Sequence, residues 1–144
     1  MTWTTRDLTV AEAAELCGFS RARLDVIIGR LDGAQTLFSA KKGGRRWFSP
    51  RDVSVLAVAH ELERFGSTWL AAVGAAYEAL QDEPAEDAIL VATLAKTMPT
   101  ITRTINDRDV SRLNVDKTTL LIPHGRLVAD IAKRSAQLTQ TAVA

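Results

Sequence analysis

Basic side chains gather in one stretch of the sequence, from Arg21 to Arg51. This stretch holds eight lysines and arginines against two acidic residues, so its formal charge is +6. The chain as a whole has 18 basic and 17 acidic residues and a net charge of +1, so the remaining residues sum to −5. The basic residues are Arg21, Arg23, Arg30, Lys41, Lys42, Arg45, Arg46 and Arg51. Such a local excess of positive charge is what the phosphate backbone of a nucleic acid requires, because binding releases its condensed counterions.

Two short helices are predicted to position the first of these cations. Thr9 and Glu12 have the spacing of a capping box, which indicates a helix start. The run Gly18-Phe19-Ser20 ends that helix and begins a second, because glycine suits a C-terminal cap and serine an N-terminal one. The inward residues of the second helix are Leu24, Ile27, Ile28 and Leu31. Two helices joined by three residues predict a helix-turn-helix.

A hairpin with a basic tip is predicted next. The β-prone residues 37–40 and 47–49 flank Gly43 and Gly44, and a Gly-Gly pair favours a tight hairpin turn. Lys41-Lys42 and Arg45-Arg46 stand on either side of the two glycines. A hairpin that follows a helix-turn-helix is a wing, so the sequence predicts a positively charged wing.

Two further helices complete the predicted N-terminal domain. Ser49, Pro50 and Asp52 suit an N-cap, the first helical position and the positive end of the helix dipole. The apolar face expected for this helix comprises Val55, Val58, Ala59, Leu62 and Phe65. Gly66 ends it, and Ser67 is expected to cap a helix with Trp69, Val73, Ala76 and Leu80 on one side.

The order of these elements over residues 8–80 resembles the DNA-binding domain of MerR-type transcriptional regulators. The resemblance rests on the segments 8–14, 17–20 and 44–53, and on the break at Phe65-Gly66. It implies a winged helix-turn-helix whose second helix reads DNA. Asp25 stands where the family usually carries arginine, and the two residues after it replace the family's aromatic residues. The long dimerisation helix and effector domain of many members have no evident counterpart.

The sequence changes character after residue 81. Residues 82–87 are acidic and contain Pro84, which predicts a linker between domain 1–81 and a segment 88–144. Within the second segment we expect a helix over 88–96, ended by Pro99, and strands over 100–105 and 118–122. Leu127, Val128, Ile131 and Leu138 have helical spacing. A final amphipathic helix is favoured over a hairpin strand there.

The residues expected to contact DNA fall into two groups. Ser20, Arg21 and Arg23 begin the second helix, which would enter the major groove. The wing and the next helix would contact phosphates or an adjacent minor groove through Lys41, Lys42, Gly43, Gly44, Arg45, Arg46 and Arg51. We expect Trp47 and Phe48 to pack the hairpin on the core rather than stack on bases.

Other classes of function find no support in the sequence. No phosphate-binding, dinucleotide-binding or zinc-protease motif is present, so no catalytic residue and no cofactor is predicted. Cys17, His60 and His124 have no spacing suited to metal ligands, and Cys17 reads as a small buried thiol. No signal-peptide pattern or long apolar run appears, so we expect a cytoplasmic protein.

The predicted fold is therefore mainly α with a small β wing, a winged helix-turn-helix followed by a small α/β C-terminal segment. We expect a homodimer that binds double-stranded DNA sequence-specifically and regulates transcription, with residues 88–144 serving dimerisation or a partner such as RNA polymerase or a recombinase. Two alternatives stay open. One is an architectural, excisionase-like factor of a mobile element, and the other is a protein-interaction module on a winged-helix scaffold.

Overall fold

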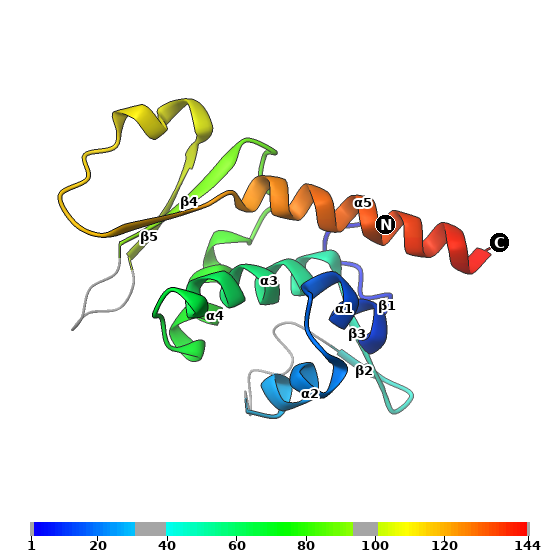
Figure 1. Cartoon of the computed structure of the whole chain (residues 1–144). Helices are drawn as coiled ribbons and strands as arrows, with labels where there is room; N and C mark the ends of the chain where they lie inside the picture. The colour runs from blue at the N-terminus through cyan, green and yellow to red at the C-terminus, as the bar shows by residue number, and fades with distance from the viewer. Residues whose placement is uncertain (1, 31–39, 94–100, 144) are drawn as a thin grey trace. The chain divides into compact units, whose positions relative to one another are not determined.

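The computed structural model describes residues 2–30, 40–93 and 101–143. The described chain is mixed α/β, with helices and two three-stranded antiparallel sheets (Figure 1). Its contacts form two compact units, Met1–Ala57 with Asp130–Ala144, and Val58–Ala129. The acidic segment 82–87, predicted as a linker, is exposed along most of its length and falls within the second unit.

The first helix of the first unit, α1 (Val10–Cys17), begins at the predicted capping box. The Thr9 hydroxyl accepts a hydrogen bond from the Glu12 amide at 3.2 Å, and the Glu12 carboxylate accepts one from the Thr9 amide at 2.8 Å. Gly18 ends the helix with a φ of 76°, in the left-handed region that glycine adopts without strain. The start and the end of α1 are confirmed.

Helix α2 (Arg21–Arg30) follows after the predicted three-residue turn. The Ser20 hydroxyl accepts a hydrogen bond from the Arg23 amide at 3.1 Å, so Ser20 caps the helix. Leu24, Ile27 and Ile28 are buried, which confirms the predicted inward face, while Leu31 lies outside the described residues. The opposite face of α2 is exposed.

A small sheet of order β1-β3-β2 completes the region around these helices. Its strands are β1 (Leu8–Thr9), β2 (Ala40–Lys42) and β3 (Arg45–Phe48). Gly43 and Gly44 join β2 to β3 with φ values of 58° and 76°, and two positive φ angles match the twist of a tight hairpin. The predicted hairpin is confirmed over 40–48, and residues 37–39 lie outside the described residues.

A buried polar network fixes the start of helix α3 (Pro50–Arg64). Ser49 and Asp52 cap each other: the Asp52 carboxylate accepts from the Ser49 amide at 2.7 Å, and the Ser49 hydroxyl accepts from the Asp52 amide at 3.1 Å. Arg6 also donates from Nε to Asp52 at 3.0 Å, where Asp52 is only 2% exposed. The N-terminal segment is thereby tied to the helix that follows the hairpin.

The end of the chain belongs to the first unit. Helix α5 (His124–Val143) contributes its residues from Asp130 onward, and Arg134 donates to the Glu15 carbonyl of α1 at 3.1 Å. Arg134 also pairs with Asp130 at 3.7 Å, and Ser135 is fully buried. The predicted amphipathic helix is confirmed, and its C-terminal part helps to build the unit that carries α1 and α2.

Cys17 is half-buried within this unit. Its thiol donates to the Val53 carbonyl at 3.6 Å, and burial raises the pKa of the thiol to about 12 although the Arg134 charge lowers it in part. We expect native Cys17 to react with iodoacetamide at pH 8 about a thousandfold more slowly than a free thiol, because the thiolate is the reactive form. Mass spectrometry over time, with a denatured control, measures both rates, and equal rates would contradict this expectation.

The second unit begins with the remainder of α3 and with helix α4 (Trp69–Ala79). Val58, Ala59 and Leu62 are buried as predicted, but Phe65 lies beyond the end of α3 and is 50% exposed. The cap of α4 is Thr68, whose hydroxyl accepts from the Ala71 amide, so the prediction of Ser67 is wrong. Gly66, with a φ of 115°, allows the turn, and the chain needs one more residue than predicted before α4 begins.

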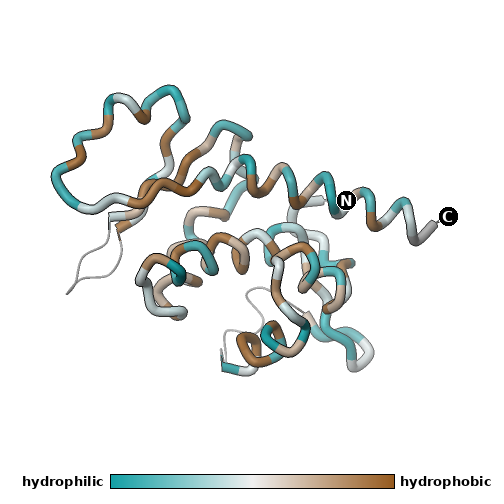
Figure 2. The backbone as a smooth tube through the Cα atoms, viewed as in Figure 1, coloured by the Kyte–Doolittle hydropathy of each residue, from teal (hydrophilic) through white to brown (hydrophobic). Residues whose placement is uncertain are grey.

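The second sheet has the order β5-β4-β6 and corrects one prediction. Residues 88–93 form strand β4 (Ala88–Thr93), not the start of the helix predicted over 88–96; residues 94–96 lie outside the described residues. A short apolar run reads equally well as a buried strand or helix, and pairing on both edges decides for the strand. Strands β5 (Ile101–Asn106) and β6 (Thr119–Ile122) confirm the other two predictions, and Figure 2 shows the hydrophobic residues along β4. A 3-10 helix, η1 (Asp107–Arg112), follows β5.

The first turn of α5 lies directly against the acidic segment. A Cβ at Gly125 would collide with the Ala85 carbonyl oxygen, and it would stand 2.7 Å from the Glu86 carbonyl and 2.9 Å from the Ala88 amide. All three are backbone atoms, so a Cβ at Gly125 could be accommodated only if the backbone of α5 or of the acidic segment moved. We expect Gly125→Ala to lower the free energy of unfolding by about 1–3 kcal/mol. Chemical denaturation measures this change, and Gly74→Ala, where a Cβ has open space, is the matched control.

His124 makes the stability of the second unit depend on pH. The side chain is fully buried, and desolvation lowers its pKa below the ordinary 6.5, while the Ile122 backbone opposes part of that shift. The unfolded chain therefore binds the proton more tightly, so this contribution to stability is complete above about pH 6.5 and is lost as the pH falls toward the folded pKa. We expect the midpoint temperature of thermal unfolding to decrease as the pH is lowered from 7 to 5. The variant His124→Gln should lose this part of the pH dependence and His60→Gln should keep it.

No helix within the described ranges is long and apolar enough to cross a membrane. Among the same residues, no group of three or more His, Cys, Asp and Glu side chains could hold a metal ion.

Candidate nucleic-acid interface

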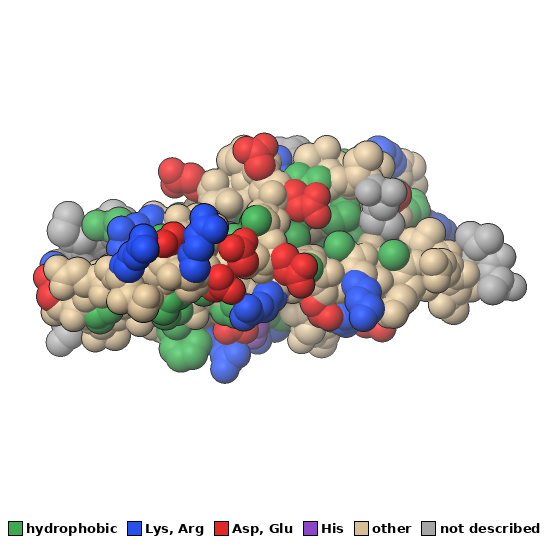
Figure 3. Space-filling view, turned by 90° about the horizontal axis from the view of Figure 1, so that it is seen from above, with side chains coloured by type: hydrophobic (Ala, Val, Ile, Leu, Met, Phe, Trp, Pro, Cys, Tyr) green, Lys and Arg blue, Asp and Glu red, His purple; other side chains and the backbone are tan. Residues whose placement is uncertain are grey.

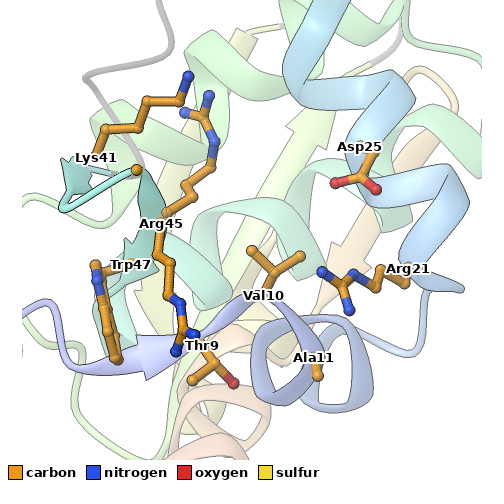
Figure 4. Close-up of a pocket in the computed structure, with 10 residues that line it drawn as sticks. Thr9, Val10, Ala11, Arg21, Asp25, Lys41, Arg45 and Trp47 are labelled. Atoms are coloured by element: carbon orange, nitrogen blue, oxygen red, sulfur yellow. The ribbon is translucent and has the colours of Figure 1, made fainter.

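A groove of about 490 Å³ opens between α2, the β2–β3 hairpin and the start of α1. Arg21 and Asp25 line it from α2, and Arg45 and Trp47 line it from β3 (Figure 4). The complete lining is Thr9, Val10, Ala11, Arg21, Asp25, Lys41, Gly44, Arg45, Arg46 and Trp47. Four of these residues are cationic and one is acidic, so the groove carries a net positive charge.

The local sequence explains how the groove is built. The Ser20 cap starts α2 so that Arg21 lies in its first turn, and Asp25 follows one turn later on the same face. The Gly43-Gly44 turn holds the two basic strand ends together, and β1 pairs Thr9 with Trp47 at the base of the hairpin. The Ser20 cap and the Gly43-Gly44 turn thus position the two sides of the groove, α2 and the hairpin. The β1–β3 pairing brings the start of α1 to the hairpin.

The hairpin holds its cations in opposed pairs. The strand register places Lys41 opposite Arg46 and Lys42 opposite Arg45. Like charges directly opposite each other in a sheet destabilise it, because their side chains lie about 5 Å apart at Cβ. Such an arrangement becomes favourable when a polyanion supplies the counter-charge.

No carboxylate within the described residues neutralises most of these cations. Arg21, Lys41, Lys42 and Arg45 form no salt bridge there, and all four are exposed. Outside the groove, Arg6, Arg64 and Arg126 each pair with a carboxylate, whereas Arg103, Arg108 and Lys117 form no salt bridge with a described residue. Figure 3 shows another face of the molecule, where basic and acidic side chains are interspersed. The groove therefore presents charge that is available to a ligand.

The other residues predicted to contact DNA lie outside the groove lining. Lys42 and Gly43 are exposed at the hairpin tip next to it, and Ser20 serves as the cap of α2. Arg23 lies over the Phe19 ring, with its guanidinium carbon 5.0 Å from the ring centroid. Arg51 lies at the start of α3, where its amide donates to the Trp3 carbonyl.

Five lining residues were not among those predicted to bind. Thr9, Val10 and Ala11 reach the groove through the strand pairing of β1, which no local pattern reveals. Trp47 is half-buried and lines the groove, whereas Phe48 is fully buried as expected for core packing. Asp25 is exposed on the groove face of α2, and its departure from the MerR-type pattern was the available signal.

Comparison with protein-family models finds no match to this chain, and no curated protein matches it either.

Proposed function

We propose that this chain is a sequence-specific, double-stranded DNA-binding protein of the winged helix-turn-helix type that regulates transcription as a homodimer. The observation that carries the proposal is the pair of opposed cation pairs at the hairpin tip, Lys41 with Arg46 and Lys42 with Arg45. The pair of Lys42 and Arg45, neither of which forms a salt bridge with a described residue, costs the free protein stability and becomes favourable when phosphates lie between and around the side chains.

The kind of motif that these elements form favours binding of a duplex over binding of a single strand. A two-helix motif of this kind lays its second helix in the major groove, and a hairpin beside it reaches the flanking phosphates or the minor groove. Of the two aromatic residues of the hairpin, Phe48 is fully buried and offers no stacking platform for unpaired bases, so half-buried Trp47 is the one aromatic ring of the groove lining that a base could reach. α2 would then present Arg21 to the base edges, and the hairpin would hold the backbone.

The transcriptional role and the homodimer rest on the resemblance to MerR-type regulators over residues 8–80. A two-fold dimer would place two copies of α2 on a palindromic site, one or more helical turns apart. RNA polymerase is the partner that this role implies, and a recombinase is the partner that an excisionase-like factor would need.

Binding to duplex DNA at two salt concentrations tests the proposal. Fluorescence anisotropy with a pool of genomic fragments should give an affinity that falls steeply between 50 and 200 mM salt, with a log–log slope of about −4.5 or steeper if five or more phosphates are contacted. Competition with unlabelled single strands and sedimentation with the bound duplex establish strandedness and stoichiometry. Absence of binding at 50 mM salt would leave the protein-interaction module as the better reading.

A further inference from the structure

We propose that Asp25 and Val26 of α2 determine base preference together with Arg21, with Asp25 accepting a hydrogen bond from the exocyclic amino group of cytosine and Val26 contacting the methyl group of thymine. This inference rests on the proposed function, since it requires α2 to lie in the major groove. It assigns a role to two residues that the electrostatic argument leaves unexplained.

Asp25 is an acidic residue in a groove whose other charged lining residues are cations. Its side chain lines the groove together with Arg21, Lys41 and Arg45 (Figure 4). It is exposed, and it forms no hydrogen bond or ion pair with any described residue. A carboxylate repels the phosphate backbone, so its presence on the DNA-facing wall opposes the binding that the surrounding cations promote. A base with a hydrogen-bond donor removes that conflict.

The second step is the chemistry that the major groove offers. Its hydrogen-bond donors are the amino groups of cytosine N4 and adenine N6, and a carboxylate matches the cytosine amino group. Guanine O6 and N7 on the paired base are acceptors, which suit the Arg21 guanidinium one helical turn before Asp25. Arg21 and Asp25 together therefore complement a G·C pair, with one donor group and one acceptor group at i and i+4.

The third step concerns the bulk of the exposed face of α2. Ala22, Val26 and Gly29 lie on this face at i, i+4 and i+7, and all three are exposed. A Cβ added at Gly29 would meet no atom within 4 Å, so packing within the described residues does not explain this glycine, which weakens the helix. Small residues on either side of Asp25 and Val26 let the helix backbone approach the base edges closely enough for two short side chains to reach them.

The group of the DNA that Val26 would contact is the methyl group of thymine. It is 50% exposed, and it stands beside Asp25 on the same turn of the helix, opposite the buried Leu24, Ile27 and Ile28. The only apolar group that B-DNA presents in the major groove is the thymine methyl group, which aliphatic side chains contact. The expected site therefore contains a thymine next to the cytosine read by Asp25.

The experiment is selection of bound duplexes from a random pool, carried out with the full chain and with Asp25→Asn. The wild-type protein should select cytosine at one position of each half-site, and replacing that pair should weaken binding by about tenfold. Asp25→Asn should move the preference toward adenine, because an asparagine amide matches adenine N6 and N7, and it should bind unrelated DNA more tightly because a negative charge is gone.

Val26 is tested on the selected site itself. Replacing thymine by uracil removes only the methyl group and should weaken the wild-type protein several-fold, whereas Val26→Ala should bind the two duplexes equally. An unchanged base preference for Asp25→Asn, with tighter binding to every duplex, would overturn the role of Asp25. If replacing thymine by uracil weakens binding of Val26→Ala as much as it weakens binding of the wild-type protein, the proposed role of Val26 is wrong.

Failure of the proposed function gives a different result. If the wild-type protein binds no duplex at 50 mM salt, DNA binding itself is wrong, and the exposed Asp25 and Val26 belong to a protein contact. If it binds every duplex equally, DNA binding stands and base reading by α2 is wrong. Thermal unfolding of both variants, which change only exposed side chains, should match the wild-type protein and so exclude misfolding.

Discussion

Replacing Lys41 and Arg45 together by alanine should weaken binding to duplex DNA by about 10- to 100-fold at 100 mM salt. Both side chains line the groove from the hairpin, both are exposed, and neither pairs with a carboxylate in the described part of the chain. Each phosphate contact that is lost should also make the log–log salt slope shallower by about 0.9, so the double variant should differ from the wild-type protein by nearly 2. Anisotropy titrations at four salt concentrations measure both quantities.

The same double variant should be at least as stable as the wild-type protein. Lys41 faces Arg46 and Lys42 faces Arg45 across the hairpin, so each substitution removes one repulsion between like charges. If the double substitution weakens DNA binding but does not lower the free energy of unfolding, the hairpin is a binding surface and does not serve the fold alone. A hairpin that serves only the fold would lose stability without a selective loss of binding.

The matched control removes two cations from the second unit. Arg108 and Lys117 are exposed outside the groove, and Arg108→Ala with Lys117→Ala changes the net charge by the same amount. We expect this control to keep the wild-type salt slope. An equal loss of affinity in both double variants would mean that net charge, and not the groove, governs binding.

Replacing Asp52 by alanine should lower the free energy of unfolding by about 3–5 kcal/mol, the largest effect on stability that we expect from a single substitution. The Asp52 carboxylate is nearly fully buried and holds both the Ser49 amide and the Arg6 guanidinium. Without it, the N-cap of α3 loses its reciprocal hydrogen bond and Arg6 loses its ion pair. Calorimetry and urea denaturation measure the change.

Two further variants separate the charge from the hydrogen bonds. Asp52→Asn keeps an oxygen that can accept from the Ser49 amide but loses the charge facing Arg6, so we expect an intermediate loss. Asp25→Asn removes the same charge from an exposed position and should leave the thermal midpoint unchanged. Equal losses for the two asparagine variants would show that net charge, and not the buried network, sets the stability.

The parts of the fold that the sequence predicted correctly depend on residues close together in the chain. Thr9 and Glu12, like Ser49 and Asp52, are three positions apart in the chain, and each pair closes its own hydrogen bonds. The Gly43-Gly44 turn likewise needs only two positive φ angles. Interactions of this kind are complete within one turn of the backbone, so composition and spacing are enough to predict them.

The predictions that were wrong have two causes, a strand pairing between distant residues and the position of a helix end. The run from Ala88 to Thr93 is a strand because β5 and β6 pair with it on both edges, and helical spacing could not reveal that pairing. Phe65 fits the apolar pattern of α3 but lies just past its end. Helical periodicity does not locate the last residue of a helix to better than one or two positions.

The sequence by itself determined the starts of α1, α2 and α3, the hairpin turn and the cluster of cations around it, because each follows from local backbone chemistry and charge. Only the tertiary structure decided which side chains share the groove. Asp25 lines the same groove as the cations of the hairpin, and Thr9 pairs with Trp47, although these residues are far apart in the chain. Residues of α5 join the first unit in the same way, through Arg134 and the Glu15 carbonyl. Such long-range contacts are settled by packing and strand register, which no local pattern specifies.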